Sequence, residues 1–88
     1  LFDRAFKLQQ SRDYQASIEK YRKLIDEFPD YTLAHFNLGA ALQSIGEDEL
    51  AFYAFQKTAQ IDPHFVKAHL NIGVLLEKQG RFDDAISV

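Results

Sequence analysis

The sequence lacks cysteine, and its prolines, glycines and apolar runs are few. The absence of cysteine from all 88 residues excludes a disulfide framework and any metal site built on cysteine ligands. Apolar runs are only a few residues long, far below the ~20 residues that span a bilayer, so we expect no membrane insertion. The 4 glycines are isolated from one another, which excludes a glycine-rich phosphate-binding loop.

An excess of positive charge is also lacking. The 10 basic and 13 acidic residues are interspersed and give a net charge of −3. Because no basic stripe is available for phosphates, we expect no nucleic-acid partner. The chain starts at Leu1 without a methionine and stops within a periodic segment, so we expect it to be a fragment of a longer protein. The sequence does not identify the cellular compartment of the protein, and we favour the cytoplasm.

What the sequence does contain is a repeat with a period of 34 residues. A fixed period of this size is typical of a solenoid, in which one two-helix unit stacks on copies of itself. We therefore predict one domain over residues 1–88, with units at approximately 1–31, 32–65 and 66–88 and the last unit truncated. The residues that recur are Ala5, Gly39 and Gly73; Leu8, Leu42 and Leu76; Pro29 and Pro63; and Asn37-Leu38-Gly39 and Asn71-Ile72-Gly73.

Helical periodicity predicts that each unit is an antiparallel helical hairpin, so the fold class is all-α. An apolar stripe along residues 18–28 ends before Pro29, because the residue before a proline is disfavoured in helical geometry. Gly46 follows the next stripe as a left-handed residue after a helix end. The last helix is expected from about Phe82 and is cut short at Val88. Breaks of only a few residues force neighbouring helices to be antiparallel.

These residues resemble the tetratricopeptide-repeat (TPR) family, whose signature is Trp-x-x-Leu-Gly-x-x-Tyr, then Ala-x-x-x-Phe, then Pro. The resemblance covers essentially the whole chain. It implies an α-solenoid of about two and a half TPR units, wound as a right-handed superhelix that serves as a scaffold for protein binding. The second unit carries the pattern as His35-x-x-Leu38-Gly39-x-x-Leu42, Ala51-x-x-x-Phe55 and Pro63.

Small residues in the pattern have a mechanical reason. Ala5, Gly39 and Gly73 are expected where two helix backbones approach closely, so that a larger side chain would push the helices apart. Replacing Gly39 with leucine should therefore overpack that crossing.

Several positions depart from the family pattern. His35 and His69 replace its large aromatic residue with a smaller and more polar ring. Arg4 stands in an apolar slot and suggests that the first helix is an end cap with a wetter face. Arg12 stands where Gly46 stands one period later, so that turn either differs or carries a small left-handed penalty.

The resemblance implies that the first helix of each hairpin lines the concave face of the superhelix. On the helical wheel, these helices keep a second face apart from their core stripe. Asparagine side chains there can both donate and accept hydrogen bonds, so they suit the backbone of an extended peptide. The candidate peptide-binding residues are Phe2, Phe6, Phe36, Asn37, Ala40, Lys67, Leu70, Asn71 and Val74.

Two alternative interpretations of these residues stay open. Phe2 and Phe6 would equally suit packing against a preceding unit. Asn37 and Asn71 would equally suit hydrogen bonds to a neighbouring helix, because buried amides usually have local partners.

Some family members clamp the acidic C-terminal tail of heat-shock chaperones with basic and amide residues. Only Asn37 and Lys67 match that set. Phe2, Phe6 and Asn71 stand where Lys, Asn and Arg would be required, so we do not expect a dicarboxylate clamp. The pair of asparagines is more similar to the asparagine ladders of superhelical peptide binders in this family.

No catalytic or cofactor chemistry is indicated. His35, His64 and His69 are the only histidines, and their spacing favours packing roles over a metal site. No serine or threonine is paired with a histidine in a nucleophile motif. We therefore expect no enzyme activity, no metal and no cofactor.

The predicted function is that of a scaffold that binds an extended peptide or partner segment in the concave groove. The alternative is a structural or self-assembly module that stacks end to end with further repeats or with another copy. The truncated third hairpin suggests this alternative, because it would leave Ile72, Leu75 and Leu76 under-covered at an open C-terminal end where a homo-oligomer could form.

Overall fold

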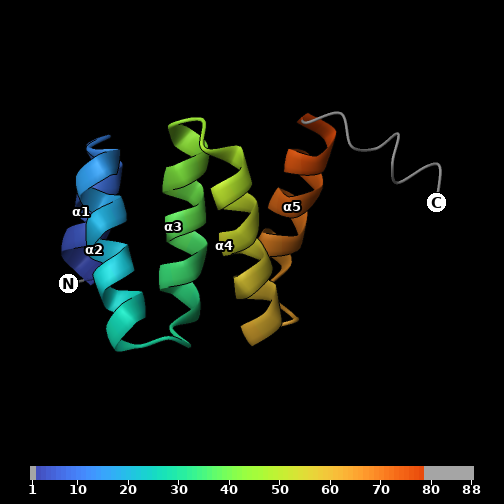
Figure 1. The fold of residues 1–88 in the computed structure, drawn as a ribbon, viewed down its shortest axis with the longest axis horizontal. Coiled ribbons are helices and arrows are strands. Elements are labelled where there is room, and N and C mark those ends of the chain that lie inside the picture. Colours follow the sequence, from blue (N-terminus) through green and yellow to red (C-terminus); the bar gives the residue numbers. More distant parts are fainter. Residues whose placement is uncertain (1, 79–88) are drawn as a thin grey trace.

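A computed structural model describes residues 2–78, and in this range the chain forms helices and no strand. The helices are α1 (Phe2–Gln10), α2 (Tyr14–Glu27), α3 (Thr32–Ser44), α4 (Asp48–Ile61) and α5 (Val66–Lys78). They form two hairpins, α1–α2 and α3–α4, followed by the first helix of a third unit (Figure 1). The all-α prediction is confirmed. The last helix, expected from about Phe82 to Val88, lies outside the described range.

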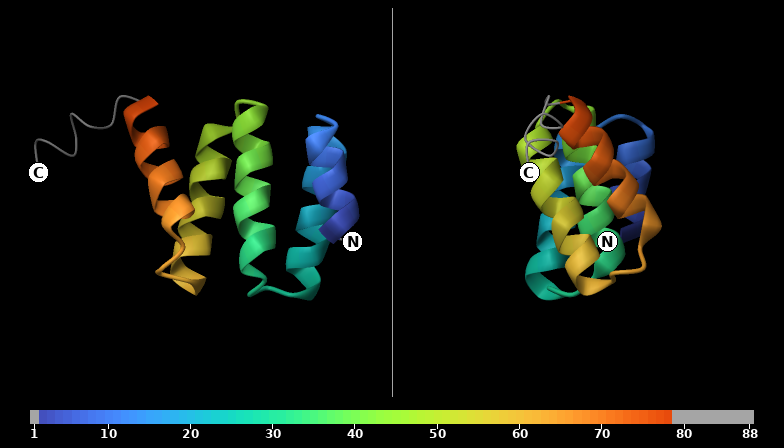
Figure 2. Two further views of the ribbon diagram at one scale, coloured as in Figure 1. Left: turned by 180° about the vertical axis from the view of Figure 1, so that it is seen from behind. Right: turned by 90° about the vertical axis from the view of Figure 1, so that its right-hand side faces the viewer.

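The helices stand side by side in chain order, and each packs against the next (Figures 1 and 2). Helices α1, α3 and α5 share one face of the molecule, whereas α2 and α4 form the opposite face (Figure 2, left). Because each unit contacts mainly its neighbours, the arrangement is the predicted solenoid.

Small side chains at the helix contacts allow this close stacking. Alanines at five positions along the array have no exposed surface, and larger apolar side chains fill the space between helices. Burial of this apolar surface is the main favourable contribution to folding. The core residues are Ala5, Ile18, Tyr21, Leu24, Ala34, Leu38, Ala41, Leu42, Ala51, Ala54, Phe55, Ala68 and Leu75.

The first and third helices end in the same left-handed turn. At Gly46, φ is +82°, and the following N–H of Glu47 donates to the Leu42 carbonyl at 2.9 Å. At Arg12, φ is +67°, and the equivalent hydrogen bond measures 2.8 Å. The turn is therefore unchanged, and Arg12 adopts the left-handed conformation at a cost of about 1 kcal/mol.

The close approach predicted at Gly39 exists, but its partner is different. A Cβ atom on Gly39 would lie 2.6 Å from Cε1 of the Phe55 ring, so the glycine makes room for an aromatic side chain of α4 rather than for a helix backbone. At Gly73, no heavy atom of residues 2–78 lies within 4 Å of such an added Cβ.

The two histidines at the family's aromatic position hold the turns between units. The Nε2 atom of His35 lies 2.8 Å from the Pro29 carbonyl oxygen, and Nε2 of His69 lies 2.8 Å from the Pro63 carbonyl oxygen. Because a carbonyl oxygen only accepts hydrogen bonds, Nε2 must carry the proton in both rings. Each histidine thus ties a helix to the turn that precedes it.

Candidate peptide-binding face

Large apolar side chains are exposed along α1, α3 and α5, and we call this surface the odd-helix face. Phe6 is 40% exposed on α1, Leu33 is 47% exposed on α3, and Leu70 and Val74 are 62% and 50% exposed on α5. Exposed apolar surface that follows a polar margin commonly marks a contact site for another molecule. Leu33 was not among the nine candidate residues.

Asn37 and Asn71 lie one period apart, on α3 and α5, and both are half-buried. Within residues 2–78, neither side chain forms a hydrogen bond, and neither amide has its polar atoms fully sealed from solvent. The alternative in which these amides bond a neighbouring helix is therefore not observed in the described part of the chain. Their donors and acceptors are available to a bound molecule.

Phe2 and Phe36 have a larger structural role than the sequence pattern suggested. Each is half-buried and belongs to a cluster of three aromatic rings, which we call an aromatic trio. Ring centroids lie 5.8 and 5.5 Å apart in the first trio and 5.5 and 4.9 Å apart in the second. The trios are Phe2 with Tyr21 and Tyr31, and Phe36 with Phe55 and Phe65.

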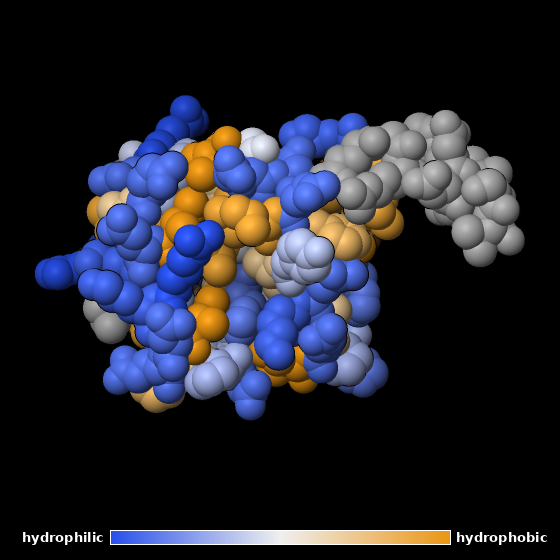
Figure 3. All heavy atoms as spheres, in the orientation of Figure 1, coloured by the Kyte–Doolittle hydropathy of each residue, from blue (hydrophilic) through white to orange (hydrophobic). Residues whose placement is uncertain are grey.

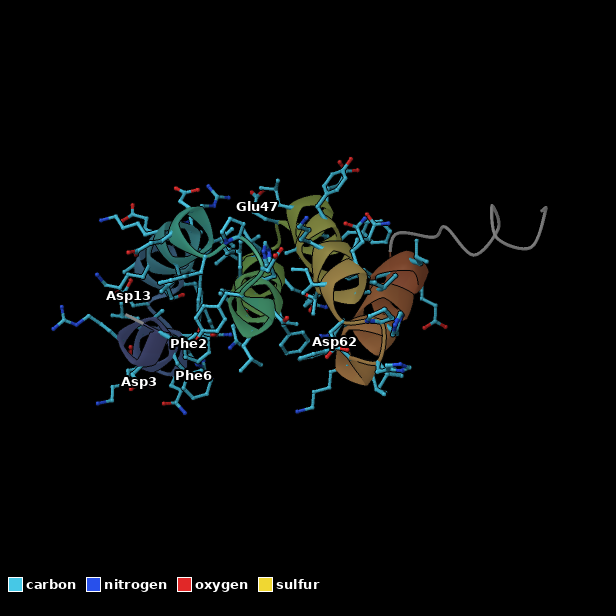
Figure 4. All side chains as sticks on the ribbon, turned by 90° about the horizontal axis from the view of Figure 1, so that it is seen from below. Phe2, Asp3, Phe6, Asp13, Glu47 and Asp62 are labelled. Carbon is cyan, nitrogen blue, oxygen red and sulfur yellow. The ribbon has the colours of Figure 1, made fainter. Side chains whose placement is uncertain are left out.

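The aromatic trios are not predicted by the sequence analysis, because their members come from three segments of each unit. The signal was nevertheless present, since all three positions are aromatic again 34 residues later. Phe6 extends the first trio, with its ring stacked 6.3 Å from that of Phe2. Both rings lie on the side of α1 that faces α3, whereas Asp3 lies on another side of the helix (Figure 4).

The charged residues of the odd-helix face differ in their partners. Lys67 is exposed and forms no ion pair within the described residues. Lys78 instead lies 3.3 Å from Asp48, which links α5 to the start of α4. The remaining candidate, Ala40, is half-buried on α3. The peptide-binding role of all nine candidates stays a prediction.

Tyr21 links the first trio to a partly buried hydrogen bond. Its hydroxyl donates to Oε1 of Gln9 at 2.7 Å, and the side chain has no exposed surface. Burial raises the pKa of Tyr21 to about 12, and the neighbouring Tyr31 adds to the effect. The hydroxyl is therefore a stable donor that fixes α1 on α2.

The opposite face, formed by α2 and α4, is mostly hydrophilic, with an apolar strip between α2 and α3 (Figure 3). A depression of about 210 Å³ in this region includes Ile18, Leu42 and Leu50. Ile18 and Leu42 are only 5% and 3% exposed, whereas Leu50 is 44% exposed.

Residues 2–78 hold no group of three histidine, aspartate or glutamate side chains arranged to hold a metal ion. Among the helices of this range, none combines the length and the apolar character that a membrane crossing requires. On α5, Leu75 has no exposed surface, and Ile72 and Leu76 are half-buried. The expectation that Leu75 is under-covered is therefore wrong, because it is buried in the core cluster.

A family model described as tetratricopeptide repeat matches residues 2–64. Two solved structures of MamA are each 29% identical to this chain, with TM-scores of 0.92 and 0.90. Each match covers 98% of this chain, and it covers 50% of the first MamA chain and 47% of the second. A mutant form of MamA, 23% identical with a TM-score of 0.87, shares the fold. The chain spans about half the length of these structures. No curated protein matches the sequence.

Proposed function

This chain belongs to the tetratricopeptide-repeat family, and we propose that it binds an extended segment of a partner protein along its odd-helix face. Family membership and the fold that it shares with MamA support a general role in protein interaction. The partner's extended backbone lies along Asn37 and Asn71. The partner's apolar side chains contact Leu33, Leu70 and Val74.

One observation carries this proposal: two half-buried amides, one period apart, have no hydrogen-bond partner within residues 2–78. Partly buried polar groups in folded proteins normally have partners, so a repeated pair without them is unusual. A peptide backbone carries a donor and an acceptor at each residue and can satisfy both amides. The exposed apolar side chains beside them would be covered by the same ligand.

The experiment is to select extended peptides from a random library on this chain and to measure the affinity of a selected peptide by calorimetry. Asn37→Ala and Asn71→Ala should each weaken binding by about 1 kcal/mol, because each removes a hydrogen bond to the ligand. Gln60→Ala is the matched control, since this exposed amide lies on α4, on the opposite face.

Affinity that survives both asparagine substitutions would show that the odd-helix face is not the binding surface. Equal losses for Asn37→Ala and Gln60→Ala would show the same, because a general effect on the protein would then explain the change. Thermal unfolding of each variant establishes that it remains folded at the temperature of the titration.

A further inference from the structure

The turn that joins α2 to α3 lies at one edge of the solenoid (Figure 1). At this turn the side chains form an open depression of about 490 Å³. Its lining residues are Glu27, Phe28, Pro29, Asp30 and Tyr31. Phe28 is 53% exposed although its side chain is large and apolar. The depression thus combines an exposed aromatic surface with two carboxylates, and none of its residues is among the candidates on the odd-helix face.

Several interactions hold this turn in one conformation. The N–H of Tyr31 donates to the Phe28 carbonyl at 3.0 Å, and Pro29 fixes its own φ angle between them. Nε2 of His35 donates to the Pro29 carbonyl at 2.8 Å. The Tyr31 ring is stacked on Phe2, with centroids 5.5 Å apart. A ligand would therefore meet a preformed surface, which lowers the entropy cost of binding.

The equivalent turn between α4 and α5 shows that the backbone does not require an aromatic residue here. Phe28 has φ −130° and ψ 81°, and Asp62 at the equivalent position has φ −130° and ψ 93°. Asp62 also uses its Oδ1 to accept a hydrogen bond from the His64 N–H at 3.1 Å. Phe28 gives up that bond and makes an edge contact with the Tyr31 ring, with centroids 6.5 Å apart, yet Phe28 stays 53% exposed.

The charge beside the ring indicates the class of ligand. Glu27 and Asp30 are exposed, and within residues 2–78 neither carboxylate forms an ion pair or a hydrogen bond through its side chain. At the second turn, the equivalent residues are Ile61 and His64, so this acidic pair is specific to the first turn. A cation that also has a flat surface complements both the carboxylates and the ring.

We propose that this depression binds an arginine side chain of a partner protein. The guanidinium group stacks on the Phe28 ring and donates its N–H groups to the carboxylates of Glu27 and Asp30. A guanidinium is planar, always charged and weakly hydrated, so it can stack and form forked hydrogen bonds at the same time. The proposal stands on the turn alone and does not depend on the odd-helix face.

The test is a titration of the full chain with N-acetyl-arginine amide, followed by amide chemical shifts in NMR. N-acetyl-citrulline amide is the matched control ligand, because it has nearly the same shape and no charge. We expect saturable shifts confined to residues 27–31 and their contacts with arginine, weakened by added salt, and none with citrulline. N-acetyl-lysine amide and N-acetyl-norleucine amide test for another cation and for an apolar occupant.

Phe28→Asp makes the first turn like the second and should lower arginine affinity by about fivefold or more, since it removes the stacking surface. Glu27→Gln combined with Asp30→Asn should lower the affinity and remove its salt dependence. Asp62→Asn, in the second turn, is the matched control and should leave the affinity unchanged. Thermal unfolding of all three variants reports whether each remains folded.

Several results would overturn the proposal. Shifts of equal size with citrulline or norleucine would show that the site recognises neither charge nor the guanidinium plane. Lysine binding as tightly as arginine would exclude the stacked arrangement. An unchanged arginine affinity in folded Phe28→Asp would place the cation elsewhere.

Discussion

In the first hairpin, Tyr21 donates its hydroxyl to Gln9 across the α1–α2 contact, whereas in the second hairpin Phe55 stands at the equivalent position and lies against Gly39. Both rings are fully buried. The two hairpins thus have the same helices and turns but different chemistry at their centres. The first has a partly buried hydrogen bond at its centre, and the second has close contact between a ring and a glycine.

The difference extends to the ends of the first helix in each hairpin. Gly46 adopts its left-handed conformation without strain. Arg12 adopts the same conformation at an energetic cost, because its Cβ atom is crowded against the backbone. Arg4 and Lys7 on α1 are exposed, although the equivalent Leu38 and Ala41 on α3 are buried. This side of α1 is therefore more solvated than the equivalent side of α3, as the sequence pattern suggested.

The largest expected effect is at the glycine of the second hairpin. Gly39→Ala should destabilise the chain by about 1–3 kcal/mol, because the added Cβ overlaps the Phe55 ring and the surrounding core must shift. Gly73→Ala should instead stabilise α5 by about 0.5–1 kcal/mol, since alanine is the better helix former. Urea unfolding of both variants measures the difference, and equal effects at the two glycines would contradict this explanation.

Two histidines form the same hydrogen bond at the equivalent turns, but only one of them is buried. His35 is 7% exposed and His69 is exposed, yet both lie 2.8 Å from a proline carbonyl. His35→Ala should cost about 1–2 kcal/mol, from the lost hydrogen bond and the lost packing. His69→Ala should cost less than about 0.5 kcal/mol. Thermal unfolding compares them, and a larger loss at His69 would show that burial does not decide the effect.

Tyr21→Phe converts the centre of the first hairpin toward that of the second. It should cost about 1 kcal/mol at neutral pH, because Gln9 loses its donor. Burial raises the pKa of Tyr21 from 10.0 to about 12 in the folded state. The folded state therefore keeps the hydroxyl proton more tightly than the unfolded state does.

Because of this difference in pKa, we expect the free energy of unfolding to fall at alkaline pH. The stability that Tyr21 contributes is complete below pH 10 and is lost as the pH rises from 10 to about 12. Urea unfolding across this range should show a steeper loss for the natural chain than for Tyr21→Phe. Identical pH dependence in the two proteins would mean that Tyr21 does not carry the effect.

The only gain in stability expected at a non-glycine position is at Arg12. Arg12→Gly should stabilise the chain by about 0.5–1 kcal/mol, because glycine adopts positive φ without the penalty. Gly46→Ala is the reciprocal change and should destabilise by about 1 kcal/mol. A melting temperature that falls in Arg12→Gly would show that the arginine side chain makes a stabilising contact.

The helices and their ends could be predicted from the sequence because the responsible residues are local and recur. Pro29, Gly46 and the short breaks act within a few residues of their own positions, so the period was enough to place them. The partner of Gly39 could not be predicted, because the Phe55 ring reaches it from another helix. A helical wheel describes one helix and contains no information on rings that approach from its neighbour.

The candidate face was predictable in position but not in detail. Leu70 and Val74 are exposed as the wheel suggests, but Phe2 and Phe36 are half-buried in the aromatic trios. Whether an asparagine has a partner depends on the distance and direction of side chains on other helices. The sequence therefore left both interpretations of Asn71 open. In the structure, the Asn71 side chain has no hydrogen-bond partner within residues 2–78.

The aromatic trios determine where this chain can be divided. Tyr31 and Phe65 follow the turn that closes each hairpin, yet their rings complete the packing of Phe2 and Phe36 in the hairpin before the turn. The helices alone suggest a boundary at the end of α4. A fragment cut there would lack Phe65, so the Phe36 ring would keep only its contact with Phe55. The smallest piece that keeps the second hairpin intact therefore extends through Phe65.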